Sequence, residues 1–135
     1  MCTYSCKDKL SVAKEDITCY KVVSYEKEKN KYYAYYRANP ISNEVFDDKK
    51  PYVAIGDGAP EPSKFFGTKY GYKFGSGYIH TFSNKNDTDD YRFGGTRIFK
   101  CIIPKGTPYL KGIDSRERST YISKQIIFVE MIAEH

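Results

Sequence analysis

His80 is the first residue to consider for chemistry, because the only other histidine of the chain is His135. It lies in residues 77–84 (GYIHTFSN), where Tyr78, His80 and Phe82 alternate onto one face of an expected strand. An imidazole between two aromatic rings can hydrogen-bond a ligand that the rings stack against. The competing interpretation is a hydrogen-bonded structural histidine, so we treat His80 as a candidate ligand-binding residue and not as a catalyst.

Acid, base and thiol catalysis find little support in the sequence. A general acid needs a desolvated carboxylate, whereas the acidic pairs lie in polar loops beside Lys, Asn or Arg. Cys101 lies in an apolar strand pattern, where a thiolate is disfavoured, and no serine occupies a strand-to-helix elbow. Cys2 and Cys6 have the spacing of half a zinc site, but no second Cys or His pair completes it.

Charge and aromatic content leave a binding role open. The net charge of +5 favours anionic partners, yet the basic residues are spread along the chain among acids, which is typical of a solvated surface. Residues 69–78 (KYGYKFGSGY) interleave lysines with aromatic rings, a pattern that suits single-stranded nucleic acid. No nucleic-acid-binding signature accompanies them, so we do not expect nucleic acid as the partner.

The elements that must position these residues are mostly strands. Runs of β-branched and aromatic residues predict strands, and the last of these should lie in the middle of a sheet. Helix is expected only as one or two turns, at residues 11–15 and 87–91. The predicted strands cover residues 17–26, 31–38, 52–55, 77–84, 96–104 and 120–132.

Two stretches between the strands are rich in glycine and proline. Residues 65–77 place four glycines among aromatic residues, and they predict either a loop whose rings cover the rim of the core or a lid over a pocket. Residues 104–112 (PKGTPYLKG) follow an apolar strand. Pro104 and Pro108 cannot donate to a strand ladder and Gly106 permits a tight reversal, so we expect a pinned turn with an architectural role.

The chain length favours one domain. We expect residues 1–15 to be a flexible lead-in and residues 16–135 to form a single α+β domain, mainly β, with a bent or split antiparallel or mixed sheet and short helices. The first thirty residues carry no signal-like or membrane-spanning apolar run, so we expect a cytoplasmic protein without a membrane partner.

Four segments together resemble the ADP-ribosyltransferase-like fold. They are residues 17–23 (ITCYKVV), 77–83 (GYIHTFS), 98–110 (IFKCIIPKGTPYL) and 121–128 (YISKQIIF). The sequence also resembles a small uncharacterised family of gut bacterial and phage proteins that share the "CYKV" opening, the "GYIH-F" strand and the "IPKGTPYLKG" turn.

The resemblance implies positions for a nucleotide site. The Arg or His of the transferases falls on Lys21, the middle element on His80, Thr81 and Ser83, and the catalytic glutamate on Gln125. An uncharged amide gives less stabilisation to the positive charge that develops on the ribose. Lys21 can still bind a phosphate, without the bidentate geometry of Arg. The resemblance therefore implies a binding cleft without its catalytic charge.

We expect a non-catalytic nucleotide or small-molecule binding protein, phage-related or encoded on a mobile element, that acts on a host signal or factor. NAD or another nucleotide is the expected ligand; no other cofactor and no metal is expected. The alternatives are an active mono-ADP-ribosyltransferase using Glu117 or Glu130, a protein-binding inhibitor of a host protein, and a nucleic-acid-binding module. A homodimer through a strand edge is an open alternative. The predicted ligand-binding residues are Tyr20, Lys21, Tyr78, His80, Thr81, Tyr121 and Gln125.

Overall fold

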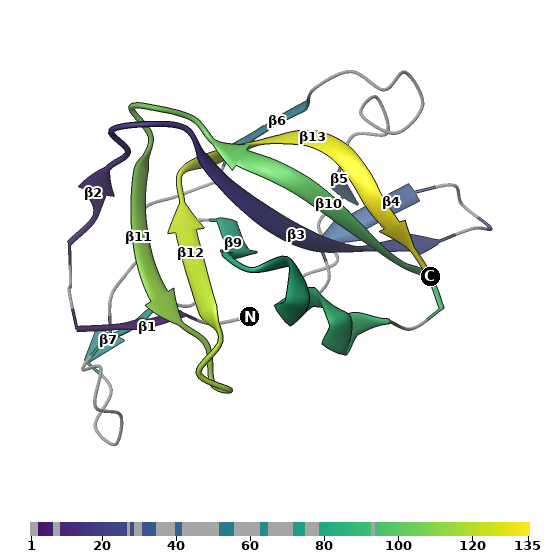
Figure 1. Ribbon diagram of the computed structural model, residues 1–135, viewed down its shortest axis with the longest axis horizontal. Coiled ribbons are helices and arrows are strands. Elements are labelled where there is room, and N and C mark those ends of the chain that lie inside the picture. The colour runs from purple at the N-terminus through teal and green to yellow at the C-terminus, as the bar shows by residue number, and fades with distance from the viewer. Residues whose placement is uncertain are drawn as a thin grey trace.

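The computed structural model describes residues 3–6, 9–26, 28, 31–34, 40–41, 52–55, 63–64, 72–74, 79–92 and 94–135. Within these residues the chain is mainly β, with a single 3-10 helix, η1 (Lys85–Tyr91) (Figure 1). The strands are β1 (Thr3–Ser5), β2 (Ser11–Val12), β3 (Ile17–Glu26), β4 (Lys31–Ala34), β5 (Pro40–Ile41), β6 (Tyr52–Ile55), β7 (Ser63–Lys64), β8 (Tyr72–Phe74), β9 (Ile79–Phe82), β10 (Thr96–Ile103), β11 (Pro108–Ile113), β12 (Ser119–Ser123) and β13 (Gln125–Glu134).

The described strands form one antiparallel sheet. Its order is β6-β13-β10-β3-β9-β12-β11-β1-β8-β7, while β2 pairs with β11, and β4 pairs with β3 and β5. The contact between β3 and β9 in the middle of this order is brief, since Tyr20 and Phe82 are the paired residues there. The sheet therefore consists of two well-paired halves joined by a narrow seam.

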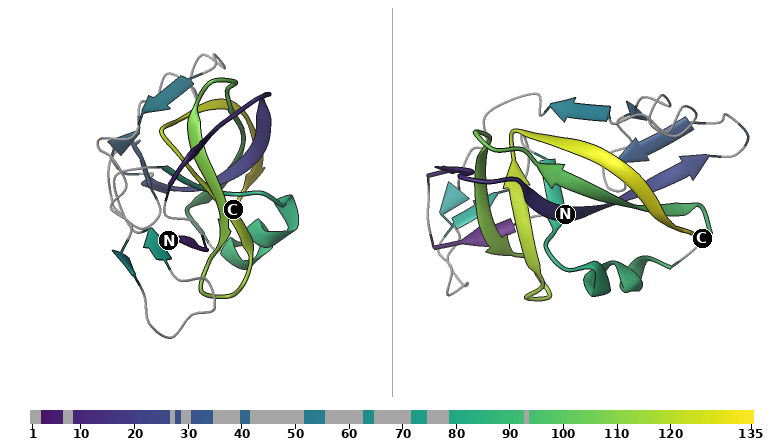
Figure 2. Two further views of the ribbon diagram at one scale, coloured as in Figure 1. Left: turned by 90° about the vertical axis from the view of Figure 1, so that its left-hand side faces the viewer. Right: turned by 45° about the horizontal axis from the view of Figure 1, so that its top comes forward.

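A long bent ribbon links the two halves. β10 and β11 run one way and β12 and β13 return beside them, with Ile113 opposite Ser119 at the closed end and Arg97 opposite Glu134 at the open end. Figure 1 shows β11 and β12 standing across the direction of β10 and β13, and the right-hand view of Figure 2 shows the same change of direction. The bend lies at residues 104–107 in one arm and at Lys124 in the other.

The corner at residues 104–107 is held by backbone hydrogen bonds. The Gly106 amide donates to the Ala13 carbonyl at 2.8 Å, and the Ala13 amide donates to the Thr107 carbonyl at 2.9 Å. Gly106 has a φ of +88°, a left-handed conformation that glycine adopts without steric penalty. The pinned turn expected at residues 104–112 is confirmed only for residues 104–107, which form a fixed corner; it is wrong for the rest, because Pro108–Ile113 is strand β11. The corner joins β10 and β11, which are not neighbours in the sheet.

The sheet packs against apolar side chains on both faces. One cluster contains residues of β3, β10 and β13: Cys19, Val23, Phe99, Cys101, Ile103, Ile126 and Phe128, together with Ala13. A second cluster lies on the other face, where Val22, Phe82 and Ile98 meet Tyr91 of η1. Figure 1 shows η1 beneath β3 and β10 on that side. Alternate residues of β3 thus serve different clusters, as the two-residue period of a strand requires.

The prediction of a flexible lead-in at residues 1–15 is wrong for two segments. Thr3–Ser5 is β1, which pairs with β11 and β8, and Ser11–Val12 is β2, which pairs with β11. Thr3 is fully buried. The error has a physical cause, because a short polar strand gains its stability from partners that are distant in sequence. The helical turn predicted at residues 11–15 is wrong for the same reason.

The other strand predictions largely agree with the structure. The helical turn predicted at residues 87–91 is confirmed within η1, and the strands at 17–26, 52–55 and 96–104 are confirmed as β3, β6 and β10. The single strand predicted at 120–132 is two strands, because the ribbon bends at Lys124, but β12 and β13 are both internal to the sheet as expected. Most of the glycine-rich stretch 65–77 lies outside the described residues.

No helix in the described ranges is both long and apolar enough to cross a lipid bilayer. The same residues contain no group of three or more His, Cys, Asp or Glu side chains arranged to hold a metal ion.

Candidate functional site

The predicted site residues divide between the two faces of the sheet. Tyr20 pairs with Phe82 and packs with it in the cluster that contains Tyr91. Lys21 follows Tyr20 in β3 and Thr81 precedes Phe82 in β9, so Lys21 and Thr81 lie together on the opposite face. Tyr20 and Lys21 therefore cannot contact one ligand from the same side of the sheet.

Lys21 and Thr81 belong to a row of side chains that crosses five strands. Lys21 of β3 is opposite Phe99 of β10. Thr81 of β9 is opposite Tyr121 of β12, and Tyr121 is opposite Lys111 of β11. Directly paired residues point to the same side of a sheet. We call this side of β3, β9, β11 and β12 the Lys21 face, and it unites three predicted site residues: Lys21, Thr81 and Tyr121.

The ammonium group of Lys21 is held among uncharged partners. Its Nζ donates a hydrogen bond of 2.7 Å to the backbone carbonyl of His80. Burial lowers the pKa of Lys21 from 10.5 to about 8, and the thiols of Cys101 and Cys19 oppose this shift. In the part of the chain that the structure describes, no carboxylate forms an ion pair with Lys21. The result is a partly buried cation without a protein counter-ion among these residues.

Buried hydroxyl groups accompany Lys21. The Oγ1 of Thr81 and the Oγ of Ser123 are buried and have no hydrogen-bond partner among the described residues. Ser123 is paired with Ile79 on one side and with Tyr109 on the other, which places it on the Lys21 face. A buried hydroxyl without a partner is unfavourable, because it has lost its hydrogen bonds to water. Both hydroxyls are closed off from solvent in this structure, and Thr81 interacts with the neighbouring Cys19 thiol.

Tyr121 supplies an aromatic surface next to these groups. Its ring centroid lies 6.1 Å from that of Tyr109, and the Nζ of Lys111 lies 5.8 Å from the Tyr121 ring centroid. The pKa of the Tyr121 hydroxyl is raised, first by burial and then by Cys19 and Tyr109. The phenol is thus neutral at physiological pH and can donate a hydrogen bond.

Two thiols complete the buried surroundings of Lys21. Burial raises the pKa of Cys19 to about 12, although Thr81 and Lys21 act in the opposite direction. Burial also raises the pKa of Cys101 well above its ordinary value, with a further contribution from Cys19. Both thiols are protonated at neutral pH, so they do not serve as anionic partners of the ammonium group.

His80 lies on the face opposite Lys21. Its Nδ1 is 3.2 Å from the Oγ1 of Thr3, and this hydroxyl is 2.9 Å from the Oγ1 of Thr120. All three residues are buried. His80 thus takes part in a polar network that connects β1 with β9 and β12, and its backbone carbonyl accepts the hydrogen bond from Lys21.

Gln125 and Ser83 lie at the ends of strands, and each forms a hydrogen bond there: Gln125 to a side chain and Ser83 to a backbone carbonyl. The Nε2 of Gln125 donates to the Oγ1 of Thr107 at 3.1 Å, so this side chain braces the corner. Ser83 bonds the carbonyl of Ser119 through its amide and its hydroxyl. Tyr78 lies outside the described residues.

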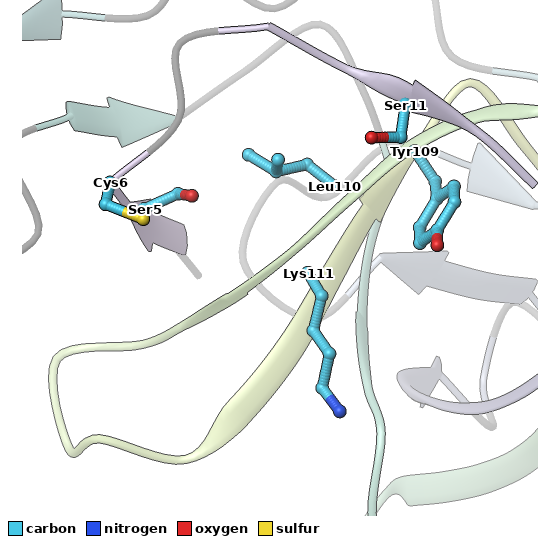
Figure 3. Close-up of a pocket in the computed structure, with 6 residues that line it drawn as sticks. All are labelled: Ser5, Cys6, Ser11, Tyr109, Leu110 and Lys111. Carbon is cyan, nitrogen blue, oxygen red and sulfur yellow. The ribbon is translucent and has the colours of Figure 1, made fainter.

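A small cavity lies near β1, β2 and β11, and two of its lining residues, Tyr109 and Lys111, neighbour the predicted site residue Tyr121. Figure 3 shows Leu110 directed toward Ser5 and Cys6, with Tyr109 and Lys111 on the other side of β11. The cavity volume is about 130 Å³. Binding sites for drug-sized ligands measure roughly 300 to 1,000 Å³, so this cavity is too small for a nucleotide. Its lining residues are Ser5, Cys6, Ser11, Tyr109, Leu110 and Lys111.

Four residues of the Lys21 face or its surroundings were not predicted from the sequence: Cys19, Tyr109, Lys111 and Ser123. Tyr109 and Lys111 lie in β11, which the sequence did not predict as a strand. Cys19 and Ser123 lie in predicted strands, but each has a paired neighbour in a strand far away in sequence. Alternation within a strand gives the face of a residue and not its partner. The strand register was the missing information.

Comparison of the chain with protein-family models, with curated proteins and with solved structures finds no match in any of the three.

Proposed function

We propose that this protein binds an anionic small molecule of the nucleotide class on the Lys21 face. The observation that carries the proposal is the Lys21 ammonium group, which is partly buried, donates to the His80 carbonyl at 2.7 Å, and forms no ion pair with a described carboxylate. A buried charge is unfavourable unless it is paired. A bound phosphate would supply the missing negative charge.

The neighbours of Lys21 suit the rest of a nucleotide. The buried hydroxyls of Thr81 and Ser123 are groups that could donate to phosphate or ribose oxygens of a ligand that reaches them. Tyr121, with Tyr109 beside it, offers a ring on which a base can stack. Nucleotide sites commonly combine three features: a charge-assisted hydrogen bond to phosphate, a hydroxyl group that bonds the ligand, and an aromatic ring that stacks on the base. NAD, or a related dinucleotide or ADP-ribose, is the ligand class we propose.

We propose that binding proceeds without catalysis. In the ADP-ribosyltransferase-like fold that the sequence resembles, the position of Gln125 would carry the catalytic glutamate. The Gln125 amide is uncharged, and its Nε2 is already bonded to Thr107 in the corner. Charge developing on a ribose would meet no carboxylate from this residue.

The active-transferase alternative would have to use another glutamate. Glu130 is opposite Lys100, and Lys100 is opposite Tyr20, so all three lie on the face away from Lys21. Glu117 lies in the tip between β11 and β12 with a φ of 61°. Neither glutamate belongs to the row of paired residues that contains Lys21, which favours the non-catalytic proposal.

A thermal-shift screen tests the proposal. The full chain is heated with NAD, ADP-ribose, cyclic nucleotides and dinucleotides, and a specific ligand raises the melting temperature by mass action. Lys21→Met removes the charge and keeps most of the apolar volume, so it should abolish the rise. Lys105→Met, at an exposed position in the corner, is the matched control and should retain it.

Gln125→Ala separates two roles for that residue. If Gln125 only braces the corner, the variant melts earlier than the parent but keeps the ligand-induced rise; if it also contacts the ligand, the rise is lost. A flat response of the parent protein to every nucleotide would contradict the proposed function.

A further inference from the structure

Two buried cysteines face each other across the central strands. Cys19 of β3 and Cys101 of β10 are directly paired in the antiparallel register. Both are fully buried and both are free thiols. Their side chains lie in the same apolar cluster, on the same side of the sheet. The third cysteine of the described residues, Cys6, is exposed.

The backbone geometry of such a pair is compatible with a disulfide. Directly opposed residues of antiparallel strands have Cα atoms roughly 4.5 to 5.5 Å apart, and the Cα atoms of disulfide-bonded cysteines are roughly 4.4 to 6.8 Å apart. In the present rotamer the Sγ of Cys101 lies 3.7 Å from the Phe99 carbonyl oxygen. Side-chain rotation can bring the two sulfur atoms together without moving the strands apart.

We propose that Cys19 and Cys101 form an oxidative modification site, which closes to a cross-strand disulfide on reaction with a peroxide. The two S–H bonds break, one S–S bond forms, and the two electrons released reduce the O–O bond of the peroxide. With hydrogen peroxide, the two thiol protons end in the two water molecules that form. Burial keeps both thiols protonated at neutral pH, so the reaction is slow and needs sustained oxidant.

The disulfide would link β3 to β10 beside Lys21. Cys19 precedes Lys21 by two residues on the same face of β3, and Phe99 of β10 is the residue opposite Lys21. The bond would also close a loop of about eighty residues, a length at which a cross-link restricts the unfolded chain strongly. Oxidation would therefore lock the central strands. This proposal does not depend on the proposed nucleotide site.

Peptide mapping of the native full-length protein tests the modification. The protein is incubated with hydrogen peroxide, alkylated, and digested with trypsin without reduction. The expected product joins residues 15–21 to residues 101–105, and its mass is 2 Da below the sum of the two reduced peptides. The Cys6→Ser variant is the matched control and should give the same cross-linked peptide. Protein oxidised in guanidinium should instead give mixed pairings.

Two outcomes of the mapping would overturn the proposal. One is that Cys19 and Cys101 both remain free under conditions that fully oxidise Cys6. The other is that either cysteine is found joined to Cys6 in the native protein. Thermal unfolding of the oxidised parent protein tests whether the disulfide stabilises the pairing of β3 with β10. We expect the melting temperature to rise by about 5 °C or more, and a reductant to reverse the rise. An unchanged or lower melting temperature would contradict this stabilisation.

Discussion

Replacing Lys21 with Met should stabilise the protein at neutral pH. Lys21 keeps its proton in the unfolded chain up to about 10.5 but in the folded chain only up to about 8. Below pH 8 the folded state must hold an ammonium group that burial disfavours. A shift of this size corresponds to about 3 kcal/mol at most, and to less for a side chain that solvent partly reaches.

The sign of the pH dependence follows from proton binding. Between about pH 8 and 10.5 the unfolded state binds a proton that the folded state has released, so the Lys21 contribution to stability rises with pH. The penalty is therefore fully present below pH 8 and disappears toward pH 10.5. Between pH 7 and pH 10 it should shrink by about 2 kcal/mol.

The expected effect of Lys21→Met on the free energy of unfolding has two parts: the burial penalty of the ammonium group is removed, and one hydrogen bond is lost. Lys21→Met leaves the His80 carbonyl without its 2.7 Å donor, which costs about 1 kcal/mol at every pH. We expect a net gain of about 1 to 2 kcal/mol in the free energy of unfolding at pH 7. At pH 10 the gain should vanish or reverse.

Urea unfolding followed by far-UV circular dichroism, at pH 7, 8.5 and 10 with a reductant present, measures these values. The raised pKa values of Cys19, Cys101 and Tyr121 make both proteins lose stability as the pH rises above 9. Because Lys21 also lowers the pKa values of Cys19 and Cys101, the difference between variant and parent isolates Lys21 best between pH 7 and 8.5. Lys105→Met should show a pH-independent difference. A difference for Lys21→Met that is constant from pH 7 to 10 would refute the reasoning.

Three further predictions concern stability and use the same urea assay. Gly106→Ala should cost roughly 1 kcal/mol, because its φ of +88° strains an L-residue while the added Cβ meets nothing within 4 Å; no loss would contradict a fixed corner. Gly112→Ala should lower the free energy of unfolding by more than about 3 kcal/mol, because the added Cβ would clash with the backbone of β1. A loss as small as that of Gly106→Ala would show that β1 does not pack as described. Arg118→Ala should lower the free energy of unfolding by about 3 kcal/mol, because it leaves the buried Asp114 carboxylate without its 2.7 Å ion-pair partner. Arg92→Ala, which removes an exposed ion pair, is the control and should cost less than about 0.5 kcal/mol. Equal losses for the two variants would refute this account.

The sequence predicted the individual strands better than their arrangement. β3, β6 and β10 were predictable because each is a dense run of β-branched and aromatic residues. The bend at Lys124 was missed because residues on both sides of it have equal strand propensity. β1 was missed because a polar tripeptide becomes a strand only through its pairing with β11 and β8. Propensity is local, and these features depend on distant partners.

The candidate site was predictable to a similar extent. Lys21, Thr81 and Tyr121 were chosen from three separate strands, and the register brings them into one row. Tyr20 and His80 were chosen from the same strands, but alternation sends their side chains to the opposite face. For Tyr20 this could have been predicted from the sequence, since two adjacent residues of one strand point to opposite sides.

The pKa of Lys21 with and without nucleotide tests the central claim most directly. Lysine labelled with ¹³C at Cε allows NMR titration of each ammonium group, and the Lys21→Met variant identifies the Lys21 signal. Without ligand we expect a midpoint at about pH 8. With saturating NAD or ADP-ribose, the phosphate should favour the charged form and raise the midpoint toward 10.5. A Lys21 midpoint that no nucleotide changes would contradict the proposal that this residue binds the anion.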